Sequence, residues 1–483
     1  MVSALTIDIG TASVRTGIVD STGRLRHLHQ CGLSVTTPQP GEVELDAVEI
    51  GRLVLSLARH TLAEGGPCEV LGITNQRATT VVFDPITGVP VGPALGWQDL
   101  RTVLDCLTFQ GDALRLAPNQ SATKVRWLVR QSGRRAEELR FATLETWVTW
   151  LLTEGDVFVT DRSNAGVNGM VTPAVDAWDA RAISLLDLDP VMLPRIVDTM
   201  DHHGRASALP GAPIITALIG DQPASLFGQS QIRAGAKITF GTGAMLDMIR
   251  AGGAPTSLLR YPSGCFPVVL RSHEGRVVWG LEAIDLSAGS CLEWLRDDLG
   301  LVRDVAESEA LAKSVDSSEG VLFVPALSGL GTPQWDFGAR GGFYGLTRGS
   351  SAAHLVRAVL EGIAQRGADL VDAAELESGT TLHELRVDGG MVANGLFTQR
   401  LADYAGRPVA VSTEREATAR GAGLMALVSA GHLTLDDVEQ LWHPSHVMEP
   451  QLSDVQRSSD RDRWSETLGR AARAIPDFSD VTF

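Results

Sequence analysis

The chain has 483 residues, too many for one hydrophobic core, so we expect two or more domains. Its 44% hydrophobic and 20% charged residues are typical of a soluble globular protein. The net charge of −17 argues against nucleic acid or an anionic membrane as a partner, and no apolar run reaches the roughly 18 residues of a membrane span. Five scattered cysteines and no apolar leader favour a cytoplasmic protein with free thiols.

The first informative stretch is LTIDIGTASVR, residues 5–15. Its apolar residues alternate as in a strand up to Asp8, Gly10 permits a tight turn, and residues 14–20 read as a second strand. Thr11, Ser13 and the backbone N–H groups of the turn can face an anion. No Walker string GxxxxGK[ST] is present, so we predict a phosphate loop built on a β-hairpin. A plain Asp-x-Gly turn is the ordinary alternative.

A second hairpin of the same kind lies at residues 237–247, KITFGTGAMLD, where a Gly-Thr-Gly turn joins two strands. Two such hairpins at the start of two halves are the layout of the actin-like ATPase fold. We therefore predict an α/β protein with two actin-like (ribonuclease H-like) domains, residues 1–230 and 231–483, flanking a nucleotide cleft. A hinge is expected near residues 228–236.

Between the hairpins, periodicity predicts a series of helices and strands. They are a helix over 46–64 capped by Asp46, a strand over 69–74, a hairpin from 79–83 with its turn at 84–88, a helix starting at 121, a buried helix over 141–152, and a strand over 157–160 with a polar loop after it, 161–168. The strand over 69–74 ends on Asn75-Gln76-Arg77, and polar clusters at such strand ends are where α/β sheets bind ligands. For Arg77 a surface salt bridge is the simpler reading, and for Trp97 a core position.

The segment PIITALIGDQ, residues 213–222, runs from a strand into Gly220-Asp221-Gln222. A carboxylate at this point can accept the proton of a substrate hydroxyl as its oxygen attacks a γ-phosphate. Asp221 could equally cap a helix over 223–229, and one residue can serve both roles.

The second half continues with elements that would complete the second domain. They are a polar turn entering a helix within 279–297, a strand over 322–326, a long helix over 352–374, a strand over 385–388, a helix from about 394, and a last helix over 418–427 in the core of this domain. Gly389 and Gly390 follow the strand over 385–388, and they would let backbone approach an adenine ring closely.

Six strings in this order closely resemble the FGGY carbohydrate kinases, and within that family they look most like the glycerol kinases. They are ITNQRATTVVFDPITG, SATKVRWLV, IGDQPASLFGQ, TFGTGAML, GGFYGLTRG with HLVRAVLE, and LRVDGGMVANGLF. The resemblance implies a two-domain kinase that binds ATP and Mg²⁺ in its cleft and phosphorylates a small polyol or sugar. Family members are often homodimers or homotetramers.

Carried over by position, the resemblance implies a role for each matching residue. Asp8 would hold Mg²⁺, Asp221 would be the general base, and the acceptor hydroxyls would meet Arg77, Trp97, Asp221 and Gln222. The nucleotide would lie against Thr11, Ala12, Ser13, Arg15, Thr242, Gly289, Glu293, Gly390 and Asn394.

Several positions depart from the glycerol kinase pattern. Ala78, Asn119 and Met245 stand where glycerol kinases have Glu, Tyr and Phe around the acceptor, while Ala12 and Glu293 replace Thr and Gln near ATP. Losing a carboxylate acceptor from a substrate hydroxyl costs about 1.5–3 kcal/mol.

We therefore expect a kinase for a longer acceptor, a C4–C5 polyol or ketose. A true glycerol kinase and a non-catalytic nucleotide- or sugar-binding sensor are the alternatives, and an ATPase is a weaker one. Asp8, Arg15, Asp221 and Thr242 are all present, which favours catalysis.

Overall fold

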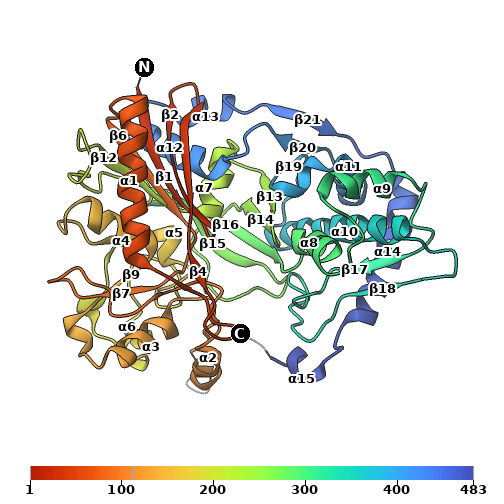
Figure 1. The fold of residues 1–483 in the computed structure, drawn as a ribbon, viewed down its shortest axis with the longest axis horizontal. Helices are drawn as coiled ribbons and strands as arrows, with labels where there is room; N and C mark the ends of the chain where they lie inside the picture. The colour runs from red at the N-terminus through yellow and green to blue at the C-terminus, as the bar shows by residue number, and fades with distance from the viewer. Residues whose placement is uncertain (1, 111–113, 482–483) are drawn as a thin grey trace.

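The structure, a computed structural model, describes residues 2–110 and 114–481 and has two lobes (Figure 1). The first half of the chain, drawn in red to yellow, forms one lobe, and most of the second half, in green to blue, forms the other. A 5-stranded sheet organises the first lobe and a 7-stranded sheet the second. The predicted two-domain α/β architecture is therefore confirmed.

The first sheet has the strand order β12-β6-β1-β2-β3. β1 pairs with β2 as an antiparallel hairpin, while β6 lies parallel to β1 and β12 parallel to β6. Leu5 and Ile7 share a core cluster with α1, whereas Thr6 donates from Oγ1 to the Ala419 carbonyl of α12 at 2.7 Å. Alternate side chains of β1 thus face helices on opposite sides of the sheet.

The elements of the first half follow the predicted order. The strands are β1 (Ser3–Ile9), β2 (Ser13–Asp20), β3 (Leu25–Gly32), β4 (Val35–Thr36), β5 (Glu44–Leu45), β6 (Val70–Asn75), β7 (Val81–Phe83), β8 (Ala94–Leu95), β9 (Arg140–Ala142), β10 (Val159–Asp161), β11 (Arg195–Val197) and β12 (Ile214–Gly220). The helices are α1 (Ala47–Gly65), α2 (Val103–Gln110), α3 (Ala122–Ser132), α4 (Leu144–Leu152), α5 (Arg162–Ala165), α6 (Ala180–Leu185) and α7 (Asp221–Gly228).

The second sheet has the order β15-β16-β14-β13-β19-β20-β21, with β13 and β14 forming the second predicted hairpin. Its strands are β13 (Ala236–Phe240), β14 (Ala244–Ile249), β15 (Phe266–His273), β16 (Arg276–Asp285), β19 (Leu385–Asp388), β20 (Val409–Ser412) and β21 (Pro444–Met448), and β17 (Leu322–Val324) pairs with β18 (Gly342–Tyr344) apart from it. The helices are α8 (Gly289–Asp297), α9 (Val305–Lys313), α10 (Ala352–Ser378), α11 (Gly395–Ala405), α12 (Ala417–Ser429), α13 (Leu435–Gln440), α14 (Asp454–Ala471) and α15 (Pro476–Ser479).

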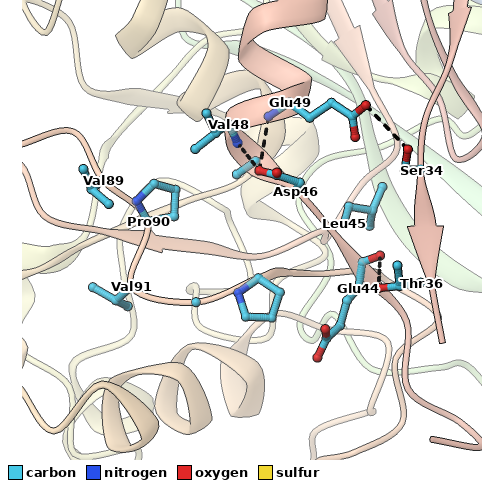
Figure 2. A pocket seen from close by; sticks show the side chains of 13 residues that line it. Ser34, Thr36, Glu44, Leu45, Asp46, Val48, Glu49, Val89, Pro90 and Val91 are labelled. Carbon is cyan, nitrogen blue, oxygen red and sulfur yellow. Dashed lines mark hydrogen bonds between the residues drawn. The ribbon is translucent and has the colours of Figure 1, made fainter. Parts of the chain in front are cut away.

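Helix α1 begins as predicted at its cap. Asp46 accepts hydrogen bonds from the backbone N–H groups of Val48 at 2.8 Å and Glu49 at 3.2 Å (Figure 2). These bonds satisfy two of the amide donors that a helix N-terminus leaves without intrahelical partners. The groove of about 550 Å³ at this helix end contains none of the residues that the sequence assigns to ATP or the acceptor (Figure 2).

One prediction about a helix is wrong in its location. Helix α12 packs on the sheet of the first lobe, where Ala422 and Leu424 share a core cluster with Ala4 and Ala217 (Figure 1). Glycine permits this close approach: a Cβ on Gly421 would lie 1.9 Å from the Ala224 carbonyl oxygen of α7. The segment therefore crosses from the second half of the chain to cover the first sheet.

Three local predictions also need correction. The helix predicted over 141–152 begins at Leu144, because the preceding residues form β9, which pairs with β7. The polar loop predicted over 161–168 contains the short helix α5, capped by Asp161. Asp221 does not cap a helix over 223–229: it is the first residue of α7, whose N-cap is Gly220.

All five cysteines are free thiols, and four of them are buried. Among the described residues, no helix combines the length and the apolar character needed to cross a membrane.

Candidate active site

The first hairpin brings a buried carboxyl group next to a cation. Asp8 lies opposite Arg15 in the antiparallel pairing, and Arg15 Nη1 is 3.1 Å from Asp8 Oδ2. Asp8 is only 2% exposed, and this burial raises its pKa to about 7 although Arg15 acts to lower it. The charge of Asp221 also raises the pKa of Asp8, so the two carboxyl groups interact electrostatically. Buried carboxyl groups with a raised pKa are frequent at functional sites.

The two predicted loops have similar backbone hydrogen bonds. Gly10 N donates to Ser13 O at 2.9 Å in the first loop, and Gly241 N donates to Gly243 O at 2.9 Å in the second. In the first loop Thr11 is half-buried, Ala12 is exposed, and Ser13 is buried.

The second loop rests on the N-terminus of α8. Gly289 N donates to Gly241 O at 2.9 Å, and Ser290 N donates to Thr242 O at 3.1 Å. A Cβ on Gly289 would lie 2.5 Å from Gly241 O, so this contact requires glycine. Thr242 remains exposed, which leaves its hydroxyl available to a ligand.

Gly389 and Gly390 lie beside the second loop. A Cβ on Gly389 would be 2.3 Å from the carbonyl oxygen of Phe240, the residue before that loop, whereas a Cβ on Gly390 would meet open space. Glu293 is exposed on α8. Asn394 is buried, and its Oδ1 accepts from Phe397 N at 3.0 Å as the cap of α11. Its amide therefore has a structural role.

The candidate acceptor site forms at the carboxyl ends of β6 and β12, which are neighbours in the first sheet. Arg77 follows β6, Asp221 follows β12, and Arg77 Nε lies 3.5 Å from Asp221 Oδ1. A Cβ on Gly220 would be 2.5 Å from Arg77 Cδ, so this arginine can lie across the end of β12 only because residue 220 is glycine. Burial raises the pKa of Asp221, and the Arg77 guanidinium partly offsets that effect.

Two contacts connect this site to the opposite lobe. Arg77 Nη2 is hydrogen-bonded to Glu282 of β16, and Lys237 Nζ of β13 donates to Gln222 Oε1 at 2.6 Å. Arg77 is therefore not engaged in a surface salt bridge: its side chain is 10% exposed and lies between carboxylates from both lobes.

The register of the second sheet explains this arrangement. Asp247 of β14 lies opposite both Lys237 and Glu282, so these three side chains share one face of the sheet. Met245, two residues earlier on β14, points to the same face. Lys237 and Asp247 form a fully buried ion pair, with Nζ 3.1 Å from Oδ2.

Trp97 connects the acceptor side to the first loop, because its Nε1 donates to Thr11 Oγ1 at 3.4 Å. The side chain is half-buried. Lys124 of α3 fixes the Trp97 segment by donating to Gly96 O at 2.6 Å. Burial lowers the pKa of Lys124 to about 7.

A second layer holds the turn before Asp221. Ser163 Oγ donates to Asp161 Oδ2 at 2.5 Å and accepts from Gly220 N at 2.8 Å. Because the Gly220 amide is fixed in this way, the start of α7 and the Asp221 backbone have a defined position.

The three departures in the predicted acceptor pocket have different surroundings. Ala78 is 5% exposed and has a φ of 61°, which is uncommon for a residue with a Cβ. Met245 is half-buried on the face that carries Glu282, and Asn119 is exposed in the turn before α3. Sequence analysis did not identify Glu282, Lys237 or Lys124. The sequence pattern that could have identified them is a single charged residue within an otherwise apolar strand or helix face.

Two hairpin loops on separate sheets, with a buried aspartate on one of them and Asp221 nearby, define a class: a two-lobed α/β phosphotransferase. Sequence comparison gives the family. The N-terminal domain of the FGGY family of carbohydrate kinases matches residues 3–228, and the C-terminal domain of that family matches residues 236–430. The chain belongs to the FGGY family of carbohydrate kinases, and it is an ATP-dependent kinase that acts on an alcohol group.

Relatives that align over nearly the full chain include glycerol kinases. The chain is 37% identical to a glycerol kinase of Deinococcus radiodurans, with 97% of each protein covered, and 38% identical to a glycerol kinase of Aromatoleum aromaticum, with 97% and 98% covered. The crystal structure of Plasmodium falciparum glycerol kinase with ADP superposes with a TM-score of 0.90 at 27% identity, covering 98% of both chains. A xylulose kinase from Lactobacillus acidophilus, at 16% identity, TM-score 0.87 and 99% coverage of both chains, shares the fold.

Proposed function

We propose that this protein is a glycerol kinase, which transfers the γ-phosphate of ATP to a hydroxyl group of glycerol. The relatives at 37% and 38% identity over nearly the whole length carry this name. They favour glycerol over the longer acceptor expected from the sequence alone. The observation that carries the proposal is the position of Glu282, whose carboxylate contacts Arg77, which also pairs with Asp221. At this position Glu282 would compensate for the carboxylate missing at Ala78.

On the acceptor side, Arg77 and Gln222 would bind glycerol hydroxyls, and the ring of Trp97 would form an apolar wall. Glu282 would accept a hydrogen bond from a hydroxyl that other glycerol kinases bind with the Glu after their arginine. Asp221 would accept the proton of the attacking hydroxyl as the new O–P bond forms. Its raised pKa suits a base that must take up a proton during the reaction.

On the nucleotide side, the residues present fit ATP and Mg²⁺. Asp8 supplies a hard carboxylate oxygen, the donor type that Mg²⁺ prefers, and Mg²⁺ when bound neutralises charge on the transferring phosphoryl group. The phosphates would be contacted by the backbone N–H groups of the two loops and by the side chains of Thr11, Ser13, Arg15 and Thr242. The open space at Gly390 would accommodate the adenine ring of ATP.

A C4–C5 polyol or ketose remains the second candidate acceptor, favoured by the pocket substitutions. Asn119 is exposed and Met245 is flexible, so neither forms the rigid aromatic wall that Tyr and Phe would provide. A kinase for longer acceptors would use the same Asp221, Arg77 and nucleotide loops.

The variant Glu282→Gln tests the proposed role of Glu282. Removing the charge while keeping the shape should raise KM for glycerol about 10- to 150-fold, the equivalent of about 1.5–3 kcal/mol, with little change in KM for ATP. The matched control is Glu274→Gln, at the exposed turn of the same β15–β16 hairpin, which should leave both constants unchanged. An unchanged KM for glycerol in Glu282→Gln would exclude this contact.

A further inference from the structure

A cluster of imidazole and carboxylate groups lies away from the candidate active site, between β3 and the last turns of α1. His27 and His29 come from β3, and His60 and Glu64 come from α1. On β2, Thr16 pairs with His29 and its Oγ1 lies 2.6 Å from Thr61 Oγ1 of α1. Arg15, the residue before Thr16, therefore points to the opposite face of the sheet. The cluster shares no residue with the phosphate loop.

The ligand atoms in this cluster have separations suited to a metal ion. His29 Nε2 lies 3.0 Å from Glu64 Oε2, and His60 Nε2 lies 3.3 Å from Glu64 Oε1. The ligand atoms of His29, His60 and Glu64 all lie within 4.8 Å of one another. A tetrahedral ion with bonds of about 2.0–2.2 Å places its ligands roughly 3.3–3.6 Å apart, so small side-chain movements suffice.

The backbone directs these side chains to one point. His60 and Glu64 are one helical turn apart and share a face of α1, and His27 and His29 are two residues apart on a strand. The β2–β3 pairing shifts register between Thr16 and Ile18, and His27 has a φ of 50° at this irregularity. Such bulges redirect individual side chains.

A fourth ligand is available at the same point. His27 Nδ1 lies 3.8 Å from Glu64 Oε2. A Cβ on Gly65 would lie 2.8 Å from His27 Cδ2, so the glycine at the end of α1 provides the space that this ring occupies. The rings of His29 and His60 meet edge to face at 4.3 Å, which leaves a nitrogen of each directed at Glu64.

We propose that His29, His60 and Glu64, with His27 as the fourth ligand, bind a divalent transition-metal ion, with Zn²⁺ as the best match. Imidazole nitrogens with a carboxylate oxygen suit Zn²⁺ and its first-row neighbours, whereas Mg²⁺ and Ca²⁺ prefer oxygen ligands alone. The four side chains are 23–56% exposed, so an ion reaches the site from solvent. Because its ligands come from both elements, the bound ion would link the edge strand β3 to α1.

The test uses the full-length, tag-free protein after removal of metal with a chelator and exchange into buffer with excess Mg²⁺, which competes for sites built from oxygen ligands alone. Titration with Zn²⁺ in a calorimeter should give one site per chain with a Kd at or below about 10 µM. Co²⁺ should give the visible absorption of a tetrahedral complex, and Zn²⁺ should raise the thermal unfolding midpoint.

Variants locate the binding. His60→Ala and Glu64→Gln change exposed side chains, and each should weaken Zn²⁺ binding more than about tenfold and abolish the rise in unfolding midpoint. Cys31→Ser, on the same strand, and His446→Ala, on β21, should bind Zn²⁺ as the wild type does. Undiminished binding in His60→Ala and Glu64→Gln, loss of binding in Cys31→Ser alone, or no saturable binding in the wild type would overturn the proposal.

Discussion

At the scale of single residues, the proposed function assigns the chemical step to Asp221. It follows β12, its Oδ1 is 3.5 Å from Arg77 Nε, and its backbone is fixed through Gly220 and Ser163. Asp221→Asn keeps this geometry but removes the proton acceptor, so kcat should fall by about 10²- to 10⁴-fold while ATP binding is retained. Steady-state kinetics with nucleotide titration measure both quantities, and Asp316→Asn on the surface serves as the control. A kcat near that of the wild type would show that another group is the base.

Asp8 gives a pH-dependent prediction about stability. Because burial raises its pKa to about 7, the folded state keeps this carboxyl protonated at pH values where the unfolded chain, with a pKa near 3.8, is ionised. Stability associated with Asp8 therefore falls as the pH rises from about 4 to about 7.

In the Asp8→Asn variant the side chain at this position is neutral at every pH, so this loss of stability does not occur. Relative to the wild type, its free energy of unfolding should rise by roughly 1–3 kcal/mol more at pH 8 than at pH 5, in urea titrations without ATP or metal. An equal difference at both pH values would mean that Asp8 ionises in the folded state as it does in a free peptide.

At the scale of elements, the contact between α7 and α12 depends on glycine. A Cβ on Gly421 would lie 1.9 Å from the Ala224 carbonyl oxygen, and one on Gly228 would lie 1.9 Å from the Ala417 carbonyl oxygen. Gly421→Ala should therefore lower the free energy of unfolding by about 1–3 kcal/mol.

Because α7 begins at Asp221, the same substitution should also reduce kcat. The matched control is Gly469→Ala in α14, where a Cβ meets nothing within 4 Å and should stabilise the protein by up to about 1 kcal/mol. Equal stability changes in the two variants, measured by denaturant titration, would show that the α7–α12 contact tolerates a methyl group.

The elements also show what could be predicted from sequence. The two hairpins, the cap at Asp46 and the strand ends carrying Arg77 and Asp221 follow from local patterns of apolar residues, glycine and polar residues, and all are present. The location of α12 could not be predicted in this way. This helix is rich in small residues, so its backbone can pack closely on either sheet, and the periodicity of its apolar residues does not indicate which one.

At the scale of the whole molecule, the site depends on contacts between lobes that sequence spacing does not reveal. Glu282 is 205 residues from Arg77 along the chain, and it reaches that guanidinium through the register of β14 and β16. The substitution at Ala78 was visible in the sequence, but the carboxylate of Glu282, which we propose compensates for it, was not. The sequence alone therefore favoured a longer acceptor, whereas the proposal of glycerol rests on the named relatives together with this contact between the lobes.

The most direct measurement is kcat/KM for a panel of acceptors in a coupled ADP-release assay: glycerol, erythritol, the pentitols, dihydroxyacetone and the common ketopentoses. If Glu282 completes the glycerol site, glycerol should have the highest kcat/KM, and Glu282→Gln should reduce that advantage. A C4–C5 polyol or ketose with a higher kcat/KM than glycerol, or ATP binding without turnover of any acceptor, would contradict the proposed function.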